Sequence, residues 1–193
     1  GRGMTVYHAK RIDTHGGSLR IHVARDASGR RPDDSVSTLL ALEAEAGLDD
    51  PGTYEAFADR VQDTVRWVRN RVRKAAEEDR SLVGYGAPAK ATTLLNVCEL
   101  SSDDLAMVVD DNPRKQGQFI PGTGIPIVAS TELEGMEQPD VFVLAWNFAD
   151  EIVANNTDLL ERGGRFFTAL PTPRVLTDSR SATAGSSEPG GGR

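Results

Sequence analysis

The sequence predicts an α/β protein, with a Rossmann-like, mainly parallel sheet that carries helices on both faces and follows a β-hairpin and two helices. Two observations predict this fold. From residue 81 onward, short apolar runs alternate with helical patterns, which is typical of parallel strands joined by helices. The first of these runs, Leu82 and Val83, leads into a glycine turn, a helix and a second strand that ends in acids. That order is typical of a nucleotide-binding βαβ unit.

A β-hairpin is expected at the start of the chain. Two β-rich runs, residues 4–12 and 18–23, are joined by the loop DTHGG, and paired glycines favour a tight turn. A two-stranded hairpin is marginally stable on its own. Residues 26–34 are polar, contain Gly29 and Pro32, and are interpreted as a linker.

Two helices are expected between the hairpin and the sheet. The first covers residues 35–46, is capped by Asp34 or Ser35, and ends at Gly47. The second begins at Pro51 with Asp50 as its N-cap, and its apolar stripe is expected to pack across the sheet. The stripe recurs at spacings of three and four and consists of Tyr54, Phe57, Val61, Val65, Val68, Val72 and Ala75.

The remaining elements alternate in the order expected of a parallel sheet. Strands are predicted at residues 81–84, 105–109, near 125–128, 141–144 and 165–169, with helices at 88–98, 131–135 and 147–160. Beyond residue 174 the composition shifts to Thr, Ser, Ala and Gly, which favours disorder. The predicted divisions are a hairpin (1–26), linker and helices (27–80), a Rossmann-like domain (81–173) and a disordered tail (174–193).

Composition excludes several classes of function. The net charge of −7 argues against a nucleic-acid surface, and no apolar run is long enough to span a membrane. Cys98 is the only cysteine, so no internal disulfide forms, and we expect it to be a core residue in a cytoplasmic protein. No metal site is expected, because the cysteine clusters of structural zinc sites are absent.

The glycine turn is the first part of the candidate binding site. Gly84 and Gly86 allow the backbone to approach a diphosphate, and Lys90 adds a positive charge in the first turn of the next helix. Asp110 ends the second strand, where a carboxylate usually meets a ribose hydroxyl, although Asp-Asp-Asn-Pro is equally a strong turn signal. On spacing alone, this region either binds a nucleotide or serves as a packing turn.

Two further loops are expected at the same carboxyl edge of the sheet. Asn112 and Lys115 follow the second strand and are candidate contacts for a pyrophosphate or a base. Trp146 either stacks on a base or sugar or caps the sheet. Asn147 either binds a hydroxyl or caps the following helix.

Four segments of the chain resemble one family and follow one another in the order found in that family. The family is the S-adenosylmethionine-dependent C-methyltransferases that act on nucleotide-linked deoxysugars in antibiotic sugar pathways. The segments are residues 84–96 (GYGAPAKATTLLN), 108–117, 120–123 and 146–152. The resemblance implies a three-part enzyme with an N-terminal zinc domain, a central methyltransferase domain and a C-terminal Rossmann-like domain. This chain resembles the last part and the end of the middle one, so the hairpin is expected to close a methyltransferase sheet.

The resemblance also implies a reaction and a base. C-methylation next to the ketone of a TDP-linked 4-keto-deoxysugar needs removal of a carbon-bound proton, and the resemblance places His15 at the substrate cleft for that task. Without the resemblance, His15 is equally read as an exposed histidine of the turn. Ser18 and Arg20 are candidates for orienting the base or the sugar phosphate. S-adenosylmethionine and zinc would be held by the rest of the same polypeptide, so the chain alone is expected to be inactive.

Two alternatives remain open from the sequence. The glycine turn and Asp110 also suit a non-catalytic module that binds NAD or another nucleotide. A scaffold domain that binds nothing is the third reading. A free Asp110 carboxylate would favour binding, whereas a turn filled by Tyr85 or Trp146 would favour a scaffold.

Overall fold

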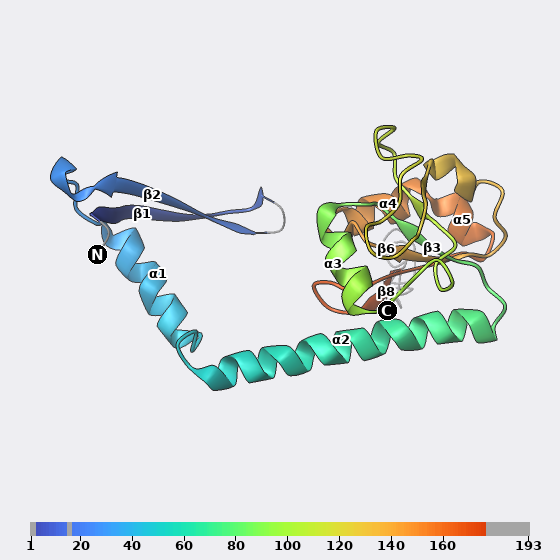
Figure 1. Ribbon diagram of the computed structural model, residues 1–193, viewed down its shortest axis with the longest axis horizontal. Helices are drawn as coiled ribbons and strands as arrows, with labels where there is room; N and C mark the ends of the chain where they lie inside the picture. The colour runs from blue at the N-terminus through green and yellow to red at the C-terminus, as the bar shows by residue number, and fades with distance from the viewer. Residues whose placement is uncertain (1–2, 15–16, 177–193) are drawn as a thin grey trace, which may run out of the picture. The chain divides into compact units, whose positions relative to one another are not determined.

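The computed structural model describes residues 3–14 and 17–176 and divides the chain into two compact units, residues 1–61 and 62–193 (Figure 1). We call these the N-terminal unit and the C-terminal unit and describe each by itself. The predicted base His15 and residues 177–193 of the predicted tail lie outside the described residues.

The N-terminal unit opens with the predicted hairpin. Strands β1 (Met4–Ile12) and β2 (Ser18–Arg25) pair antiparallel, with Ile12 opposite Ser18, and the register shifts between Val6 and His8. A short 3₁₀ helix, η2 (Asp26–Ser28), follows β2.

Helix α1 (Asp34–Glu45) begins one residue earlier than predicted. Its N-cap is Asp33, whose carboxylate accepts a hydrogen bond from the backbone N–H of Ser35, so the expected caps Asp34 and Ser35 are wrong by one or two positions. The same carboxylate lies 2.8 Å from His8 Nδ1 and so ties the helix start to β1. Gly47 follows the helix with a φ of 66°, in agreement with the predicted stop.

Helix α2 (Pro51–Glu77) forms as predicted, with the Asp50 carboxylate capping its first turn. In the C-terminal unit its apolar stripe packs on the sheet, where Val68 and Ala75 are buried. In the N-terminal unit Tyr54 and Phe57 are 55% and 57% exposed, so within the described part of the chain the stripe is buried along its second half only. Of the described helices, none combines the length and apolarity needed to cross a bilayer.

The C-terminal unit is built on a six-stranded sheet with the order β5-β4-β3-β6-β7-β8. All neighbouring strands are parallel except β8, which pairs antiparallel with β7. The strands are β3 (Leu82–Tyr85), β4 (Val108–Val109), β5 (Ile127–Val128), β6 (Asp140–Val143), β7 (Arg165–Thr168) and β8 (Arg174–Leu176). The predicted Rossmann-like fold is thereby confirmed.

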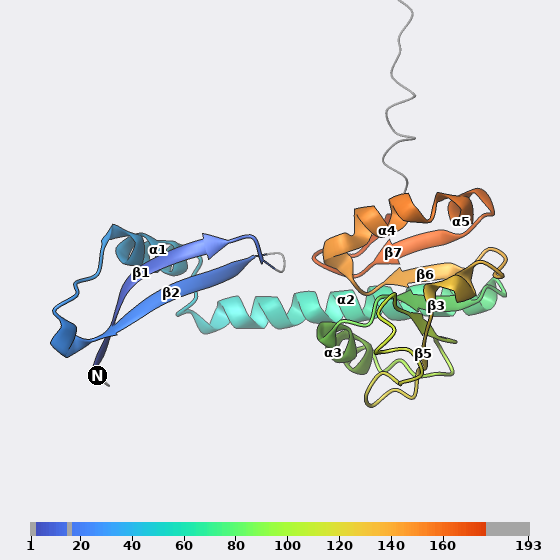
Figure 2. The same ribbon diagram turned by 90° about the horizontal axis from the view of Figure 1, so that it is seen from above.

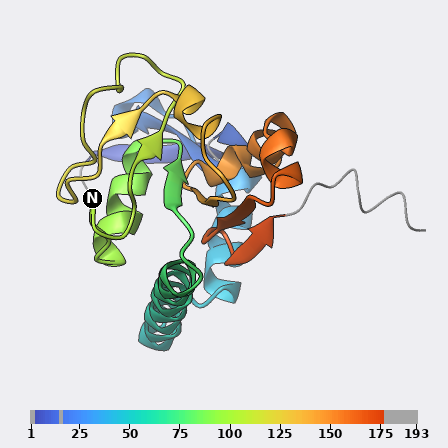
Figure 3. The same ribbon diagram turned by 90° about the vertical axis from the view of Figure 1, so that its right-hand side faces the viewer.

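Helices cover both faces of this sheet, as Figures 2 and 3 show. Helix α3 (Ala89–Val97) and the second half of α2 enclose one core, which includes the fully buried Cys98. Helices α4 (Ala149–Asn155) and α5 (Thr157–Glu161) enclose the other core. The sheet is therefore buried on both sides, which accounts for the continuous apolar character of its strands.

Several boundaries differ from the prediction. Residues 105–107 turn toward β4 rather than belonging to it, and the expected helix at 131–135 is the 3₁₀ helix η3 (Ser130–Leu133). The expected helix at 147–160 is divided into η4 (Trp146–Phe148), α4 and α5. The side chain of Asn156 donates to the carbonyl of Ile152 at 2.7 Å, and such local bonds compete with a helical backbone.

The predicted start of the tail is also wrong by three residues. Residues 174–176 form β8 and complete the sheet, with Leu176 opposite Phe166 and only 4% exposed. Burial of one apolar side chain and pairing with β7 outweigh the polar composition that follows.

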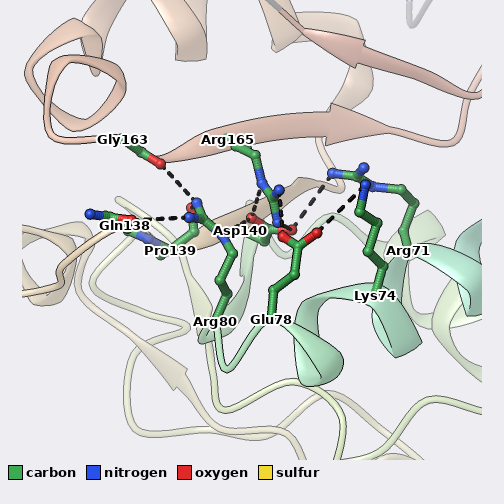
Figure 4. A network of polar contacts seen from close by, with 9 residues as sticks. All are labelled: Arg71, Lys74, Glu78, Arg80, Gln138, Pro139, Asp140, Gly163 and Arg165. Carbon is green, nitrogen blue, oxygen red and sulfur yellow. Dashed lines mark hydrogen bonds and ion pairs between the residues drawn. The ribbon is translucent and has the colours of Figure 1, made fainter.

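A buried ion network lies at the amino end of β6 (Figure 4). The Asp140 carboxylate, 1% exposed, accepts hydrogen bonds from Arg80 at 2.8 Å and from Arg165 at 2.7 and 2.8 Å. Arg71 Nη2 lies 3.6 Å from the same carboxylate, and Glu78 pairs with Arg165 at 2.6 Å. One carboxylate thus links the end of α2 to β6 and β7, at the edge of the sheet opposite the candidate site.

Candidate functional site

Three loops meet at the carboxyl edge of the sheet, and they follow β3, β4 and β6. The chain leaves β3 through α3 on one face of the sheet, and it leaves β6 through α4 and α5 on the other. Since β3 and β6 are neighbours, the winding reverses between them. Open α/β sheets bind their ligands at such a switch point.

Both glycines of the turn are required by packing inside the protein. A Cβ at Gly84 would lie 2.8 Å from Val108 Cγ2 and 2.9 Å from Leu144 Cδ1. Gly86 has a φ of 84°, and a Cβ there would lie 2.6 Å from the Cβ of Ala145. These contacts explain the GYG sequence without a ligand, which agrees with the packing-turn alternative.

Asp110 is tied into the loops and is 8% exposed. Its Oδ2 accepts hydrogen bonds from the N–H of Ala87 at 2.7 Å and from Lys115 Nζ at 2.9 Å, and its Oδ1 accepts one from the N–H of Asn112 at 2.9 Å. Burial raises the pKa of Asp110, but these hydrogen bonds outweigh it and leave the pKa below the ordinary 3.8. The carboxylate is charged and engaged, so it holds the glycine turn and its own loop in place.

Asn112 and Lys115 complete that loop. The Asn112 side-chain oxygen accepts a hydrogen bond from the N–H of Arg114 at 3.0 Å, which is an Asx turn. Lys115 is occupied by its ion pair with Asp110. Both predicted residues are therefore brought to the edge of the sheet, where they shape the loop.

Lys90, Trp146 and Asn147 form a second group, which we call the Lys90 cluster. Lys90 Nζ lies 3.9 Å from the centre of a Trp146 ring and donates to Asn147 Oδ1 at 3.0 Å. Trp146 packs against the core on the α3 side. The three residues were predicted separately, and the structure brings them into contact above the start of α3.

A cleft of 440 Å³ opens at the switch point on the α4 side. Of the predicted residues, Gly86, Asp110, Asn112 and Lys115 line it, whereas Gly84 and the Lys90 cluster do not. The predicted site is therefore split, with one half in the cleft and the other half above α3.

Eight lining residues were not among the predicted binding residues, and four of them carry aromatic or acidic groups: Tyr85, Asp111, Phe148 and Glu151. Burial raises the pKa of Tyr85, so its phenol stays protonated and donates to Asp111 Oδ2 at 3.5 Å. Phe148 is 60% exposed at the rim, and Glu151 is exposed in the first turn of α4. Tyr85, Asp111 and Phe148 are direct sequence neighbours of predicted residues, so position at or after a strand end was the signal that could have found them. Glu151 lies in α4 and had no such signal.

The hairpin candidates lie in the N-terminal unit. The Ser18 hydroxyl donates to the carbonyl of Thr14 at 2.9 Å, and Ser18 also lines a separate cleft of 660 Å³ between the hairpin end and α1. Arg20 is exposed on β2, opposite Lys10. Neither contact bears on a role in catalysis.

Comparison with known proteins identifies the family to which this chain is similar. Residues 13–171 match the family described as the C-methyltransferase C-terminal domain. The chain is also 35% identical over 175 residues to C-methyltransferase NovU of Streptomyces niveus, an alignment that covers 91% of this chain and 42% of that relative. The chain thus spans less than half the length of the curated relative it matches.

Proposed function

This chain belongs to the family of C-methyltransferase C-terminal domains, and from this membership we propose the function of the whole protein. It is a cytoplasmic, S-adenosylmethionine-dependent enzyme that methylates the carbon next to the ketone of a TDP-linked 4-keto-deoxysugar in antibiotic sugar biosynthesis. The C-terminal unit binds the nucleotide sugar. The observation that carries this proposal is the similarity to a C-methyltransferase along 91% of the chain.

The cleft at the switch point supports the binding role. It lies where open α/β sheets bind their ligands, and its volume of 440 Å³ falls within the usual range for small-molecule sites. Its lining combines amides and carboxylates with the exposed ring of Phe148. Such a lining suits a ligand that carries both flat rings and hydroxyl groups.

The chain contributes the base in this proposal. His15 lies between the end of β1 at Ile12 and the start of β2 at Ser18. An imidazole accepts the carbon-bound proton next to the ketone, which leaves an enolate. When bound, S-adenosylmethionine would supply the methyl group of its sulfonium to the enolate carbon and would leave as a neutral thioether. Ser18 and Arg20, on the strand that follows, orient the base or the sugar phosphate.

The methyl donor does not fit the glycine turn of this chain. The Ala87 N–H of that turn is taken by Asp110, and both of its glycines are packed against neighbouring side chains. We therefore assign S-adenosylmethionine, and a structural zinc ion, to the part of the polypeptide that corresponds to the unmatched length of the relative. It follows that the chain alone does not transfer methyl groups.

The hairpin is proposed to complete a methyltransferase sheet in the same polypeptide. Three side chains that alternate along β2 are between 45% and 52% exposed, namely Leu19, Ile21 and Val23. Among the described residues, β2 pairs with β1 alone. An apolar strand face and an unpaired strand edge both favour addition of further strands.

A methyl-transfer assay tests the proposal. The full polypeptide that carries this chain is incubated with S-adenosylmethionine and a TDP-4-keto-deoxysugar, and the product mass is measured. A general base supplies about 10²- to 10⁴-fold, so His15→Asn is expected to lower turnover by at least about 10²-fold. His22→Asn is the matched control in the same hairpin and is expected to stay within about twofold. Absence of any mass gain with the unaltered protein would refute the proposed function.

A scaffold role is the second candidate, and the Asp110 contacts favour it over a dinucleotide module. The carboxylate that would meet a ribose hydroxyl is already bonded to three donors. A scaffold predicts no heat on titration of the chain with either thymidine diphosphate or NAD. Saturable binding of either ligand contradicts it, and NAD alone would indicate a dinucleotide module.

A further inference from the structure

The cleft at the switch point has an unusual charge for a site that takes a nucleotide. Its charged lining residues are Asp110, Asp111, Glu151 and Lys115, so the lining holds three carboxylates and one ammonium group and carries a formal charge of −2. Lys115 Nζ is already paired with Asp110 at 2.9 Å. The nearby Lys90 does not line the cleft and is held by Trp146 and Asn147.

Backbone donors in the turn do not compensate for this charge. The N–H of Ala87 binds Asp110, and the N–H of Gly86 binds the carbonyl of Val109 at 2.7 Å. Helix α4 carries Asp150 and Glu151 in its first turn, which offset the positive end of its dipole. A diphosphate inside this cleft would meet repulsion from the lining and would find these donors occupied.

The rest of the lining suits an uncharged ring. Phe148 stands 60% exposed at the rim, and Pro88 and Ile152 add apolar surface. Asn112 and Asn155 carry amide groups, and the exposed carboxylate of Glu151 is able to accept hydrogen bonds from hydroxyls. A base that stacks on the aromatic ring, joined to a hydroxylated pentose, matches both kinds of surface.

The chemistry of the reaction separates the two ends of a nucleotide sugar. Removal of a proton next to the ketone forms an enolate, and neighbouring carboxylates would raise the energy of that anion. We propose that the cleft binds the nucleoside end of the nucleotide sugar, with the base against Phe148, the pentose toward Glu151 and the asparagine amides, and the diphosphate and reacting sugar outside. This assignment rests on the proposed function, because it takes the nucleotide sugar as the ligand.

Calorimetric titration of the full polypeptide with thymidine, thymidine monophosphate and thymidine diphosphate tests the assignment. Thymidine is expected to bind, and each added phosphate is expected to change the dissociation constant by less than about threefold. Because salt screens the repulsion, the affinity for thymidine diphosphate is expected to hold or rise between about 0.02 M and 0.3 M salt.

Three variants locate the binding. Phe148→Ala is expected to weaken thymidine by about five- to tenfold or more through loss of stacking. Glu151→Gln is expected to tighten thymidine diphosphate by about three- to tenfold and to change thymidine by less than about twofold. Glu161→Gln removes the same charge from α5, away from the cleft lining, and is expected to change neither.

Two results overturn the assignment. The first is thymidine diphosphate binding more than about tenfold tighter than thymidine, with affinity falling as salt rises, which shows that phosphates are bound by positive groups. The second is no saturable binding of thymidine. Either result leaves the proposed function intact if the same preparation transfers a methyl group. A preparation that binds thymidine but transfers no methyl group refutes the proposed function instead.

Discussion

Replacement of Asp140 by Asn is expected to destabilise the C-terminal unit more than most single substitutions. The change keeps the shape of the side chain and removes its charge. Three arginines that now share one carboxylate, Arg71, Arg80 and Arg165, would be left around a neutral amide. The Asn amide group would also face guanidinium donors, so at least one buried hydrogen bond becomes a clash between donors.

The size of the effect follows from burial. The Asp140 side chain is 1% exposed, and those of Arg71 and Arg80 are 16% and 13% exposed. Removal of one partner from a buried ion pair costs about 3–5 kcal/mol, because the remaining charge stays uncompensated. Glu78 still pairs with Arg165, so we expect the lower part of that range, about 3–4 kcal/mol. A domain of this size then loses roughly 10–15 °C in its melting temperature.

Tryptophan fluorescence in urea measures this change selectively. The two tryptophans of the chain, Trp67 and Trp146, both lie in the C-terminal unit, so their emission follows that unit alone. Asp158→Asn is the matched control, since it removes a carboxylate that is 72% exposed and paired with Arg162, and should cost under about 0.5 kcal/mol. A loss below about 1 kcal/mol for Asp140→Asn would show that the network contributes little and that our reasoning is wrong.

Three further predictions concern the sheet edge and the core. Gly86→Ala combines a positive φ with a Cβ 2.6 Å from that of Ala145, and should cost about 2–4 kcal/mol in urea unfolding; a change under about 1 kcal/mol would contradict the packing role. Burial raises the pKa of the Cys98 thiol to about 11, so a thiol reagent at neutral pH should label the native protein far more slowly than the urea-unfolded one, and equal rates would refute this. Asp110 has a pKa below 3.8 in the fold despite burial, because hydrogen bonds such as that from Ala87 outweigh it. The stability that the ionised Asp110 contributes is therefore present above pH 3.8 and is lost as pH falls through the folded pKa. The difference in free energy of unfolding between the protein and Asp110→Asn should therefore become smaller from about pH 6 to about pH 3. A difference that stays constant over this range would refute the prediction.

Much of the fold could be predicted because its signals are local. Alternation of apolar strands with helical periods depends on neighbours a few residues apart, and so does the cap of α2 at Asp50. The strand β8 escaped prediction because a run of only three residues, Arg174–Leu176, precedes a polar tail. Its pairing with β7 is a tertiary contact that composition does not reveal.

The loops of the candidate site were predicted for the same reason. Strand ends mark the loops at the carboxyl edge, so residues such as Asp110 and Trp146 could be singled out. Their partners could not, because Asp110 bonds to Ala87 and Trp146 contacts Lys90, each across many residues of chain. The Asp140 network was missed entirely, since its arginines are charged residues that sequence patterns assign to a solvated surface.

The bond from the Ala87 N–H to Asp110 has a consequence for how the turn responds to its surroundings. The carboxylate is part of the same chain and is already aligned, so its effective concentration exceeds that of any dissolved phosphate by orders of magnitude. A free anion could bind this N–H only by displacing the Asp110 carboxylate, which is covalently part of the same chain. The turn is therefore organised before any ligand arrives, and ligand binding does not need to form it.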